Sequence, residues 1–477
     1  MPELPEVETV KETLKNFIIG KKIIDVIVNY DKIVKSPSVE TFVKKITNQT
    51  FTDIRRYGKY LLFDLEKNTL VSHLRMEGKY YIRDSVTEFT KHEHIIFKLD
   101  NNKYLTYHDV RKFGTMELVE LHKENDLESI KVLGKEINDP DLNVSYLYPL
   151  IKKSSRPIKS LLLDQHIVTG LGNIYVDETL FLAKIHPRKI GNELSYYQIE
   201  KIIKSAKKVI DKAISLGGTT IRTYQSTLGV DGRFQNELNV HTLVGKKCKV
   251  CNDVVQKIRV GGRGTYLCPR CQRENFPLII GLTGGISSGK SLVSNMFSDK
   301  NICVIDADKI YKTLLKTNKI MYNKLVSGFG NSIVKDNNIN LRTLGNIVYN
   351  SSEKREKLNK ITHPFILEEM KNRVLKAKEQ CKKMIVLDVP LLFETKIDHM
   401  VNLIMSVYVN YDTQVNRLMI RDNIDSKQAE AKIKSQMDIK TKKYLADIVI
   451  DNNNDIANTQ KQFNEIYNRL RSDGFVN

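Results

Sequence analysis

The feature that most restricts the fold is a glycine-rich loop in the second half of the chain. Residues 284–291 spell GGISSGKS, which fits the pattern GxxxxGK[ST], and an apolar run at 278–283 precedes them. Such a loop cradles phosphates with its backbone N–H groups when it connects a buried strand to the N-terminus of a helix. The loop therefore predicts an α/β domain with a parallel sheet from about residue 278, and the residues before it must fold separately.

Length and composition support this division. The chain has 477 residues, whereas a single hydrophobic core stops growing near about 250–300 residues. Apolar segments at 302–305, 384–389, 403–409 and 448–450 alternate with helical segments, as in a parallel α/β sheet. Hydrophobic residues make up 41% and charged residues 28% of the chain, which excludes a mainly disordered, collagen-like or fibrous protein.

The sequence gives no indication of a membrane or secreted protein. It has no apolar run of about 18 residues, the length that a membrane-spanning helix needs. The N-terminus, MPELPEVETV, is acidic and lacks the apolar core of a secretory signal. We therefore expect a cytoplasmic protein without a membrane partner.

The first half of the chain shows three successive patterns. Residues 1–135 begin with a helix that ends at Gly20 and continue with short alternating apolar runs, which are typical of a β-sandwich. Residues 136–238 have helical periodicity, with a capping box formed by Ser195 and Gln198. Residues 239–273 contain paired cysteines. With the α/β part at 278–477, we expect four domains.

The charge is concentrated in the middle of the chain. The formal net charge is +20, and residues 151–275 hold 22 basic and 10 acidic side chains, against 23 and 24 in the first 150 residues. Such a basic segment favours a polyanionic partner. A lysine-rich, solvated surface is the alternative interpretation.

Four cysteines have the spacing of a metal site. Cys248 and Cys251 form one CxxC pair, and Cys268 and Cys271 form another after 16 intervening residues. This pattern predicts four thiolates around one tetrahedral zinc ion. The segment between the pairs is basic and rich in glycine, which suits a hairpin tip that contacts phosphate. A purely structural zinc ribbon is the alternative.

The N-terminus offers a candidate nucleophile. Initiator methionine is commonly removed before proline, which would leave Pro2 with a free secondary amine. An α-amino group has a pKa near about 8, so a fraction is unprotonated at neutral pH and can attack a sugar aldehyde carbon to form an imine. Glu3 and Glu6 lie beside it as candidate acids and bases. The alternative is an ordinary helix start, with proline and acids in the first turn.

Several motifs follow in a characteristic order. MPELPEVET is followed by GKYLL at 58–62, HLRMEG at 73–78, Asp109 with RKFG at 111–114, GLGNIY at 170–175 and the paired cysteines. Over about residues 1–273 this order resembles the formamidopyrimidine-DNA glycosylases. The resemblance implies a β-sandwich, a helix–two-turns–helix domain and a zinc finger. It also implies excision of oxidised purines, such as 8-oxoguanine and formamidopyrimidine, from double-stranded DNA and nicking of the abasic strand.

The resemblance also implies roles for individual residues. Pro2 would be the Schiff-base nucleophile and Glu3 the proton donor, while Lys59 would support β-elimination and Arg263 would contact phosphate and assist δ-elimination. Apolar wedges and a guanidinium can fill the gap that a flipped base leaves. Met76, Arg111 and Phe113 would have that task, and Glu6, His92, Arg156, Lys159 and Asn173 would be further DNA-binding residues.

Two features qualify this resemblance. The segment before the first cysteine, 240–247, lacks the tyrosine-glycine-arginine of some family members. The segment at about 219–230 is expected to cover the lesion base, but it does not indicate which base is preferred. PELPE rather than PEGPE at the start argues against a pyrimidine-preferring sister enzyme.

The second half has the residues of a phosphate-transfer site. Lys290 is placed to reach the β- and γ-phosphates of ATP, and Ser291 to hold Mg²⁺. Asp306 and Asp308 follow the next predicted strand, where open α/β sheets bind ligands, and one of them could accept a hydroxyl proton. Arg417 and Arg421, four residues apart on a predicted helix, could close over phosphates. The alternatives are a strand-end turn for the acids and a solvated helix face for the arginines.

These motifs are accompanied by VIDAD at 304–308, THP at 362–364, DVPLLFE at 388–394 and Gln436. Together they resemble dephospho-CoA kinase over about residues 278–477. The resemblance implies ATP-dependent phosphorylation of the 3′-hydroxyl of dephospho-CoA, with Asp308 as base. His363, Leu391 and Leu392 would lie near the acceptor, and Leu292 stands where the family allows threonine. The residues expected at the nucleotide are Gly284, Gly285, Ile286, Ser287, Ser288, Gly289, Lys290, Ser291, Leu292, Arg417 and Arg421.

The sequence thus predicts a monomeric, bifunctional fusion with one zinc ion per chain and with ATP, Mg²⁺, dephospho-CoA and lesion-containing DNA as ligands. Other functions stay open for each half. The first could be a non-catalytic lesion-binding module or a pyrimidine-preferring glycosylase. The second could be another small-molecule P-loop kinase or a nucleotide-gated structural module.

Overall fold

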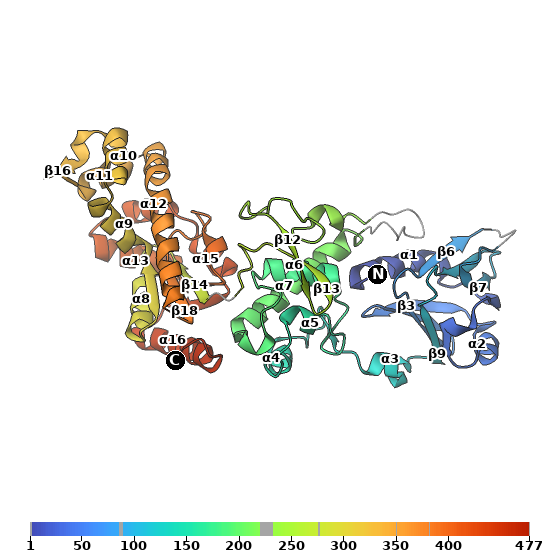
Figure 1. The fold of residues 1–477 in the computed structure, drawn as a ribbon. Helices are drawn as coiled ribbons and strands as arrows, with labels where there is room; N and C mark the ends of the chain where they lie inside the picture. Colours follow the sequence, from blue (N-terminus) through green and yellow to red (C-terminus); the bar gives the residue numbers. More distant parts are fainter. Residues whose placement is uncertain are drawn as a thin grey trace. The chain divides into compact units, whose positions relative to one another are not determined.

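The computed structural model describes residues 2–84, 89–219, 232–274, 277–349, 351–380 and 382–476 (Figure 1). The chain forms two compact units. Unit 1 consists of Met1–Leu194 and Ile199–Glu274, and unit 2 of Ser195–Gln198 and Asn275–Asn477. The described residues contain no helix that is both long and apolar enough to cross a membrane.

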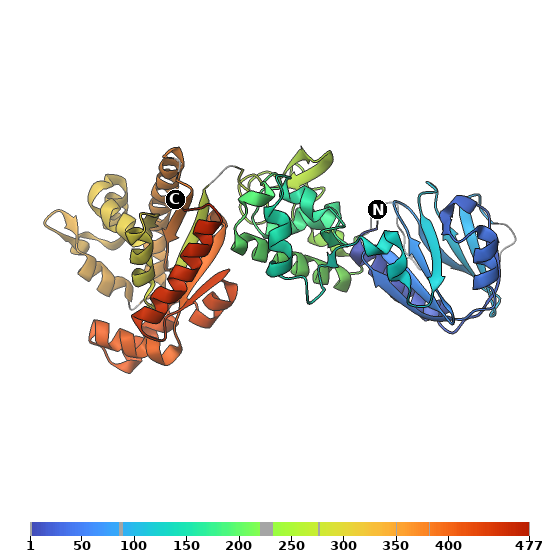
Figure 2. The same ribbon diagram turned by 90° about the horizontal axis from the view of Figure 1, so that it is seen from below.

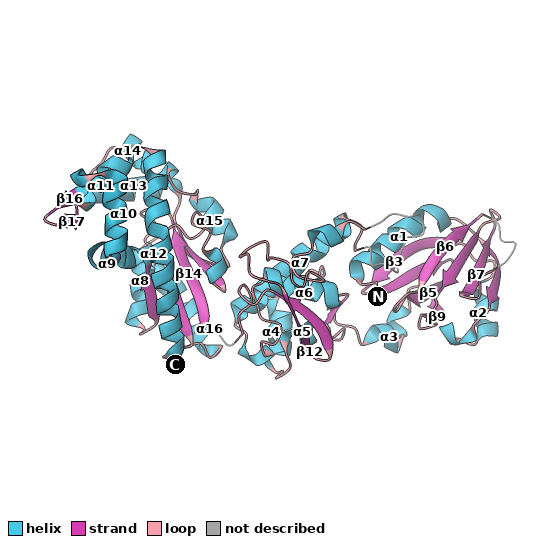
Figure 3. Ribbon diagram, turned by 45° about the horizontal axis from the view of Figure 1, so that its top comes forward, coloured by secondary structure: helices cyan, strands magenta, loops and turns pink. Residues whose placement is uncertain are grey.

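Unit 1 begins with helix α1 (Leu4–Ile18) and a sandwich of two β-sheets (Figure 3). The first sheet has the order β1 (Ile23–Val28), β7 (Glu93–Leu99), β8 (Tyr104–His108) and β6 (Lys79–Arg83). The second has the order β2 (Val34–Ser36), β9 (Thr115–Glu120), β5 (Asn68–His73), β4 (Tyr60–Leu65) and β3 (Phe51–Tyr57). All pairs are antiparallel except β2 with β9.

One hydrophobic core joins the two sheets to the helices. Val10 and Leu14 of α1, Phe42 of α2 (Val39–Ile46), Phe63 of β4 and Phe97 of β7 are all buried in it. The residues of this core recur every three to four positions in α1 and every second position in β4 and β7, as residues on one face of a helix or a strand do. The predicted β-sandwich is therefore confirmed.

The remainder of unit 1 is mainly helical. Its helices are α3 (Glu128–Lys131), α4 (Val144–Lys152), α5 (Ile158–Leu162), α6 (Asn173–Leu182) and, from Ile199 onward, α7 (Tyr196–Ser215). The short strands β10 (Lys135–Glu136) and β11 (Val168–Thr169) pair in parallel. The expected capping box precedes α7: Gln198 N–H donates to Ser195 Oγ, and Ser195 N–H donates to Gln198 Oε1, both at 3.0 Å. The cysteine segment forms a hairpin of β12 (Gln256–Val260) and β13 (Arg263–Leu267).

Unit 2 contains the predicted parallel sheet. Its order is β15 (Cys303–Asp306), β18 (Met384–Asp388), β14 (Leu278–Gly284), β19 (Leu403–Tyr408) and β20 (Ile448–Asp451). Alternate residues of β14 face two different cores, because Ile280 and Leu282 pack with α8 (Lys290–Asp299) and α16 (Ile456–Ser472), whereas Ile279 packs with α9 (Ala307–Thr317) and α12 (Ser352–Glu379). Helices thus cover both faces of the sheet (Figure 2).

The other elements of unit 2 surround this sheet. They are α10 (Lys319–Phe329), β16 (Val334–Lys335), β17 (Asn338–Ile339), α11 (Leu341–Tyr349), α13 (Tyr411–Asp422), α14 (Ser426–Lys434) and α15 (Ile439–Leu445). The helix before β18, α12, is a continuous helix of 28 residues that includes Pro364. The THP motif therefore lies within a helix.

Candidate active sites

The first site is built around the start of α1. Pro2 and Glu3 are both buried, and Glu3 N–H donates to Glu6 Oε2 at 2.9 Å. Glu6 Oε1 in turn accepts hydrogen bonds from the Tyr175 hydroxyl and from N–H and Oγ1 of Thr219. Both oxygens of Glu6 therefore accept hydrogen bonds within the protein, and Glu6 anchors the N-terminal turn to α6.

Glu3 directs its carboxyl group at the turn before α6. Its Oε1 accepts from Ile174 N–H at 3.2 Å, and a Cβ at Gly172 would lie 2.1 Å from Glu3 Cδ, so only glycine fits there. Its Oε2 is buried without a hydrogen-bond partner among the described residues. Burial raises the pKa of Glu3, although the nearby charge of Lys59 opposes this shift. A proton-donating form of Glu3 is thus favoured.

Lys59 lies between β3 and β4 and reaches the same turn. Its side chain is buried, and Nζ donates to the Leu171 carbonyl at 2.7 Å. Burial lowers the pKa of Lys59, with Glu3 opposing the shift and Arg263 adding to it. Gly58, at φ +58°, packs against Thr169 and makes the hairpin that delivers this lysine. A lysine with a lowered pKa can accept a proton from a sugar carbon.

The cysteine hairpin brings Arg263 to this region. Arg263 starts β13 after a turn at Gly261 and Gly262, which both have positive φ. The Gly264 carbonyl accepts from Asn173 Nδ2 at 3.0 Å and from Lys159 Nζ at 3.1 Å. The charge of Arg263 contributes to the lowered pKa of Lys59. Glu3, Lys59, Asn173 and Arg263 are therefore brought together around the start of α6.

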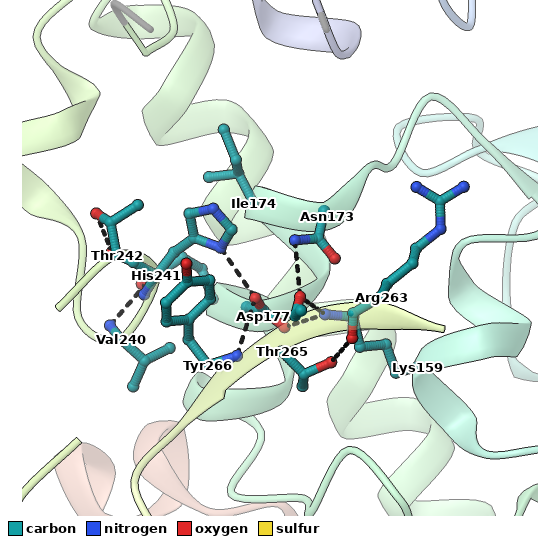
Figure 4. Close-up of polar contacts among 12 residues, drawn as sticks. Lys159, Asn173, Ile174, Asp177, Val240, His241, Thr242, Arg263, Thr265 and Tyr266 are labelled. Atoms are coloured by element: carbon teal, nitrogen blue, oxygen red, sulfur yellow. Dashed lines mark hydrogen bonds and ion pairs between the residues drawn. The ribbon is translucent and has the colours of Figure 1, made fainter. Parts of the chain in front are cut away.

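Lys159 has a different setting from the one expected for a phosphate ligand. Its side chain is fully buried, and Nζ forms an ion pair of 2.7 Å with Asp177 (Figure 4). Burial lowers the pKa of Lys159, and Asp177 opposes the shift. Contact with a phosphate would require Lys159 to give up one of these partners, so this role stays a prediction. Sequence analysis missed Asp177, which no motif marks.

Two neighbouring loops present the predicted wedge residues. Met76 is 38% exposed and Phe113 is 52% exposed, and the Arg111 guanidinium lies 4.7 Å from the centre of the Phe113 ring. Asp109 is buried, and its carboxylate accepts hydrogen bonds from the backbone N–H groups of Arg111, Phe113 and Gly114. Asp109 thus shapes the loop that exposes these side chains.

The two wedge loops share one neighbour that sequence analysis missed. A Cβ at Gly78 would lie 2.3 Å from the Tyr107 hydroxyl oxygen, and a Cβ at Gly114 would lie 1.6 Å from it. Tyr107 is fully buried. Both glycines are therefore required by close packing on the same side chain, which keeps the loops adjacent.

The last two predicted DNA contacts lie near the surface. The ring centre of His92 is 5.6 Å from that of His108, and Nδ1 of each ring is buried without a partner among the described residues. Arg156 is exposed and pairs with Asp164 at 2.8 Å. Of the segment expected to cover the lesion base, only Thr219 falls within the described residues.

The four cysteines fit a zinc ion. Their sulfur atoms all lie within 4.8 Å of one another, with 3.9 Å between Cys248 and Cys271 and 3.4 Å between Cys251 and Cys268. A tetrahedral site with Zn–S bonds of about 2.3 Å needs sulfur atoms about 3.8 Å apart. Three of the four residues are buried, so the ion would hold the base of the β12–β13 hairpin.

The second site surrounds the glycine-rich loop of unit 2. A cavity of about 500 Å³ is lined by residues 285–291 together with Asp308, Arg417 and Arg421. Lys290 pairs with Asp388 at the end of β18. Asn452 donates to the Ser288 carbonyl at 2.8 Å and leaves no room for a side chain at Gly289, whose φ is +87°. Leu292 does not line the cavity but packs toward the core.

A second cavity of about 340 Å³ adjoins the first. Asp308, Pro390 and Gln436 line both cavities, and His363 and Leu391 line only the second. Leu392 is fully buried in the core behind it. Burial raises the pKa of Asp308, whereas Lys290 lowers it. Asp308 is thus the carboxylate between the two compartments, while Asp306 caps α9 by accepting from Lys309 N–H at 3.0 Å.

A buried lysine near these cavities was missed by sequence analysis. Lys442 is 0% exposed, and its Nζ donates to the Pro390 carbonyl and pairs with Glu394, both at 2.8 Å. Lysine is almost never fully buried without a partner, and the Pro390 carbonyl and Glu394 are the partners that stabilise Lys442 in this position. No local pattern marks it among the many lysines of the chain.

Comparison with known families divides the chain where the sequence motifs do. Three family models match the first part: the formamidopyrimidine-DNA glycosylase N-terminal domain at residues 1–116, its H2TH domain at 133–225, and a zinc finger found in FPG and IleRS at 245–273. The model of dephospho-CoA kinase matches residues 278–458.

Individual relatives cover the first part. The formamidopyrimidine-DNA glycosylase of Listeria innocua is 44% identical over 273 residues, which are 57% of this chain and all of that protein. That of Oceanobacillus iheyensis is 47% identical over 273 residues, 57% of this chain and 98% of that protein. A solved complex between the Lactococcus lactis enzyme and abasic-site DNA is 44% identical, with a TM-score of 0.54, and covers 57% of this chain and all of that one.

Proposed function

Since the chain belongs to the formamidopyrimidine-DNA glycosylase family through residues 1–273 and contains a dephospho-CoA kinase domain at 278–458, we propose that it performs both reactions. The first part is a DNA glycosylase and abasic-site lyase that excises oxidised purines. The second transfers the γ-phosphoryl group of ATP to the 3′-hydroxyl of dephospho-CoA. The observation that supports the first activity best is the buried Glu3 carboxyl group at the same turn as Lys59, with one oxygen that has no hydrogen-bond partner in the described part of the chain.

The glycosylase chemistry starts at Pro2. Its amine attacks the sugar carbon that bears the damaged base, and Glu3 supplies a proton as the base leaves and an imine forms. Lys59 then takes a proton from the sugar, and the C3′–O bond breaks. Arg263 binds the phosphate that leaves in the following δ-elimination. The raised pKa of Glu3 and the lowered pKa of Lys59 support these roles, because each favours the protonation state that its step requires.

DNA binding involves the remaining predicted residues. We propose that Met76, Arg111 and Phe113 fill the space of the flipped base, and that Asn173, His92 and Arg156 contact phosphates. The exposure of Met76 and Phe113, which are large apolar side chains, supports the first role. Cys248, Cys251, Cys268 and Cys271 would hold zinc, whose contribution is to stabilise the hairpin that presents Arg263.

The kinase chemistry depends on Asp308. It takes the proton from the acceptor hydroxyl, which then attacks the γ-phosphorus, while Lys290 exchanges Asp388 for the phosphates. Ser291 would hold Mg²⁺, which neutralises phosphate charge, and Arg417 and Arg421 would close over the nucleotide. The position of Asp308 between the two cavities supports this assignment.

The finer organisation is also a proposal. We assign residues 1–135 to the sandwich domain, 136–238 to the helix–two-turns–helix domain, 239–273 to the zinc finger and 278–477 to the kinase. We further propose a monomer, located in the cytoplasm, where its DNA, ATP and dephospho-CoA substrates occur together.

The glycosylase is tested with a duplex that contains one 8-oxoguanine. Borohydride should trap the full chain covalently on this DNA, and Pro2→Gly should abolish trapping, because it replaces the ring-held secondary amine by a less basic primary amine on an unconstrained backbone. Lesion binding without any adduct in the unaltered protein would instead indicate a binding module. Stronger trapping on an oxidised pyrimidine than on 8-oxoguanine would favour the pyrimidine-preferring alternative.

The kinase is tested by its acceptor. ATP turnover should depend on dephospho-CoA and should yield CoA, while nucleosides and other small alcohols should not support it. ATP hydrolysis independent of every acceptor would contradict the kinase assignment and favour a nucleotide-gated module.

A further inference from the structure

Helix α6 presents two consecutive buried carboxylates to the cysteine region. Asp177 and Glu178 are 0% and 1% exposed. Asp177 Oδ1 pairs with Lys159, while Asp177 Oδ2 accepts from Tyr266 N–H at 3.2 Å and lies 2.9 Å from His241 Nδ1 (Figure 4). Because a carboxylate paired with a lysine only accepts hydrogen bonds, His241 must carry its hydrogen on Nδ1.

Glu178 explains how His241 reaches this carboxylate. Its two oxygens accept from the backbone N–H groups of Asn239, Val240 and His241 at 2.9–3.1 Å. This segment is where the sequence departs from the tyrosine-glycine-arginine of some relatives. The backbone is therefore held by one carboxylate while the His241 side chain is directed onto the other. The His241 ring also lies against Tyr266, with ring centres 4.6 Å apart.

These contacts converge on the strand that begins with Arg263. Asp177 holds β13 at Tyr266, and Lys159 and Asn173 hold it at Gly264, next to Arg263. In Figure 4 the Arg263 side chain extends from the strand away from this cluster. The orientation of Asp177 thus determines where the strand, and with it Arg263, is held.

We propose that His241 is a positioning residue for Arg263, acting through Asp177, and that it governs δ-elimination more than base excision. The inference rests on the proposed glycosylase function. Pro2 and Glu3 directly precede α1, and Lys59 lies in the β3–β4 turn. Glu3 accepts from Ile174 N–H and Lys59 donates to the Leu171 carbonyl, so these hydrogen bonds run to the start of α6 and the turn before it rather than to β13.

The step concerned is the second strand cleavage. After β-elimination has broken the C3′–O bond, loss of a proton from C4′ lets the C5′–O bond break, and the phosphate leaves with the electron pair. A correctly placed guanidinium stabilises the charge on that phosphate. A displaced Arg263 would therefore stop the reaction after β-elimination.

The experiment uses the full chain and a duplex with a preformed abasic site, and it measures the ratio of δ- to β-elimination products. His241→Phe keeps the ring against Tyr266 but removes the donor, and it should lower the ratio about fivefold to tenfold, as expected for one lost hydrogen bond. Borohydride trapping should change less than about twofold, since its groups do not depend on this contact. His241→Asn, which can donate from Nδ2, should restore most of the ratio.

Controls separate positioning from folding. Thr242→Val removes only the hydrogen bond from Thr242 Oγ1 to the His241 carbonyl, so it should leave the ratio unchanged. An unchanged ratio in His241→Phe would overturn the inference. Equal losses of trapping and both eliminations, or loss of bound zinc, would also overturn it, because His241 would then be merely structural. If the unaltered protein traps no DNA, the proposed function fails first and this inference fails with it.

Discussion

The two units both place a carboxyl group with a raised pKa beside a lysine. Glu3 in unit 1 and Asp308 in unit 2 both have pKa values raised by burial, and in both cases the nearby lysine opposes the shift. Their proposed tasks are nevertheless opposite, because Glu3 must donate a proton and Asp308 must accept one. The direction of a pKa shift therefore does not determine whether a carboxyl group serves as acid or base.

What differs is the partner of each lysine. Lys59 is buried against a backbone carbonyl, and burial lowers its pKa. Lys290 is paired with Asp388 at the edge of a cavity that is lined by the glycine-rich loop. In the proposed reaction Lys290 stays charged and exchanges Asp388 for the phosphates. The lysine in unit 1 instead receives a proton itself.

The sharpest test of this comparison replaces each carboxyl group by its amide. Glu3→Gln should lower single-turnover base excision by about 10²–10⁴-fold, and Asp308→Asn should lower CoA formation by a similar factor, which is the usual contribution of general acid–base catalysis. Both rates are measured in each preparation, so the unaltered unit is the folding control. Loss of both activities in either variant would contradict the assignment of separate sites.

The pH dependence should differ in sign between the units. Protonated Glu3 is lost as the pH rises through its raised pKa, so base excision should fall on the alkaline side by about tenfold per pH unit. Deprotonated Asp308 is lost as the pH falls through its raised pKa, so phosphoryl transfer should fall on the acid side.

Measurements of kcat/KM against pH for both reactions of the same protein check the alkaline fall of base excision and the acid fall of phosphoryl transfer. In Glu3→Gln the alkaline limb of base excision should disappear, while the kinase profile keeps its shape. If kcat/KM fell on the same side of the pH range in both reactions, the proposed role of either Glu3 as acid or Asp308 as base would be wrong.

The sequence predicted those parts of the sites that local patterns encode. The start of α1, the cysteine pairs and the glycine-rich loop lie within short stretches whose spacing is set by helix, turn and metal geometry. The buried partners could not be predicted in this way. Lys159 meets Asp177 and Gly264, which are 18 and 105 residues away, and its exchange of solvent for an ion pair depends on how α5, α6 and β13 pack.

Neighbouring residues of similar type also separate only in three dimensions. Leu391 lines the second cavity, whereas Leu392 is buried in the core. The local sequence does not indicate the continuous α12 either, because a proline usually ends a helix. Hydrophobic packing along α12 on the sheet, through Met370 and Val374, offsets that local cost. Fold class therefore follows from sequence periodicity more readily than the direction of a single side chain.

The smallest expected effect concerns the missed lysine of unit 2. Lys442 joins the Pro390 carbonyl to Glu394, and Glu394 also accepts from Met437 N–H at 3.0 Å. The adjacent Gln436 accepts from Ile286 N–H in the glycine-rich loop at 3.1 Å. Lys442 therefore connects the segment between the two cavities to the loop that is proposed to hold phosphates. Removal of its charge should loosen Pro390, which lines both cavities.

Lys442→Met should raise the KM for dephospho-CoA about tenfold and lower kcat less, because binding geometry rather than proton transfer is altered. Lys443→Met, on the exposed side of the same helix, is the matched control and should have little effect. Glu394→Gln combined with Lys442→Met should recover part of the loss, since an unpaired buried charge costs more than a removed pair. A larger effect on kcat than on KM would instead place Lys442 in the transfer step. The comparison of Lys59 with Lys290 would then have to include Lys442 as a second lysine that acts in the kinase reaction.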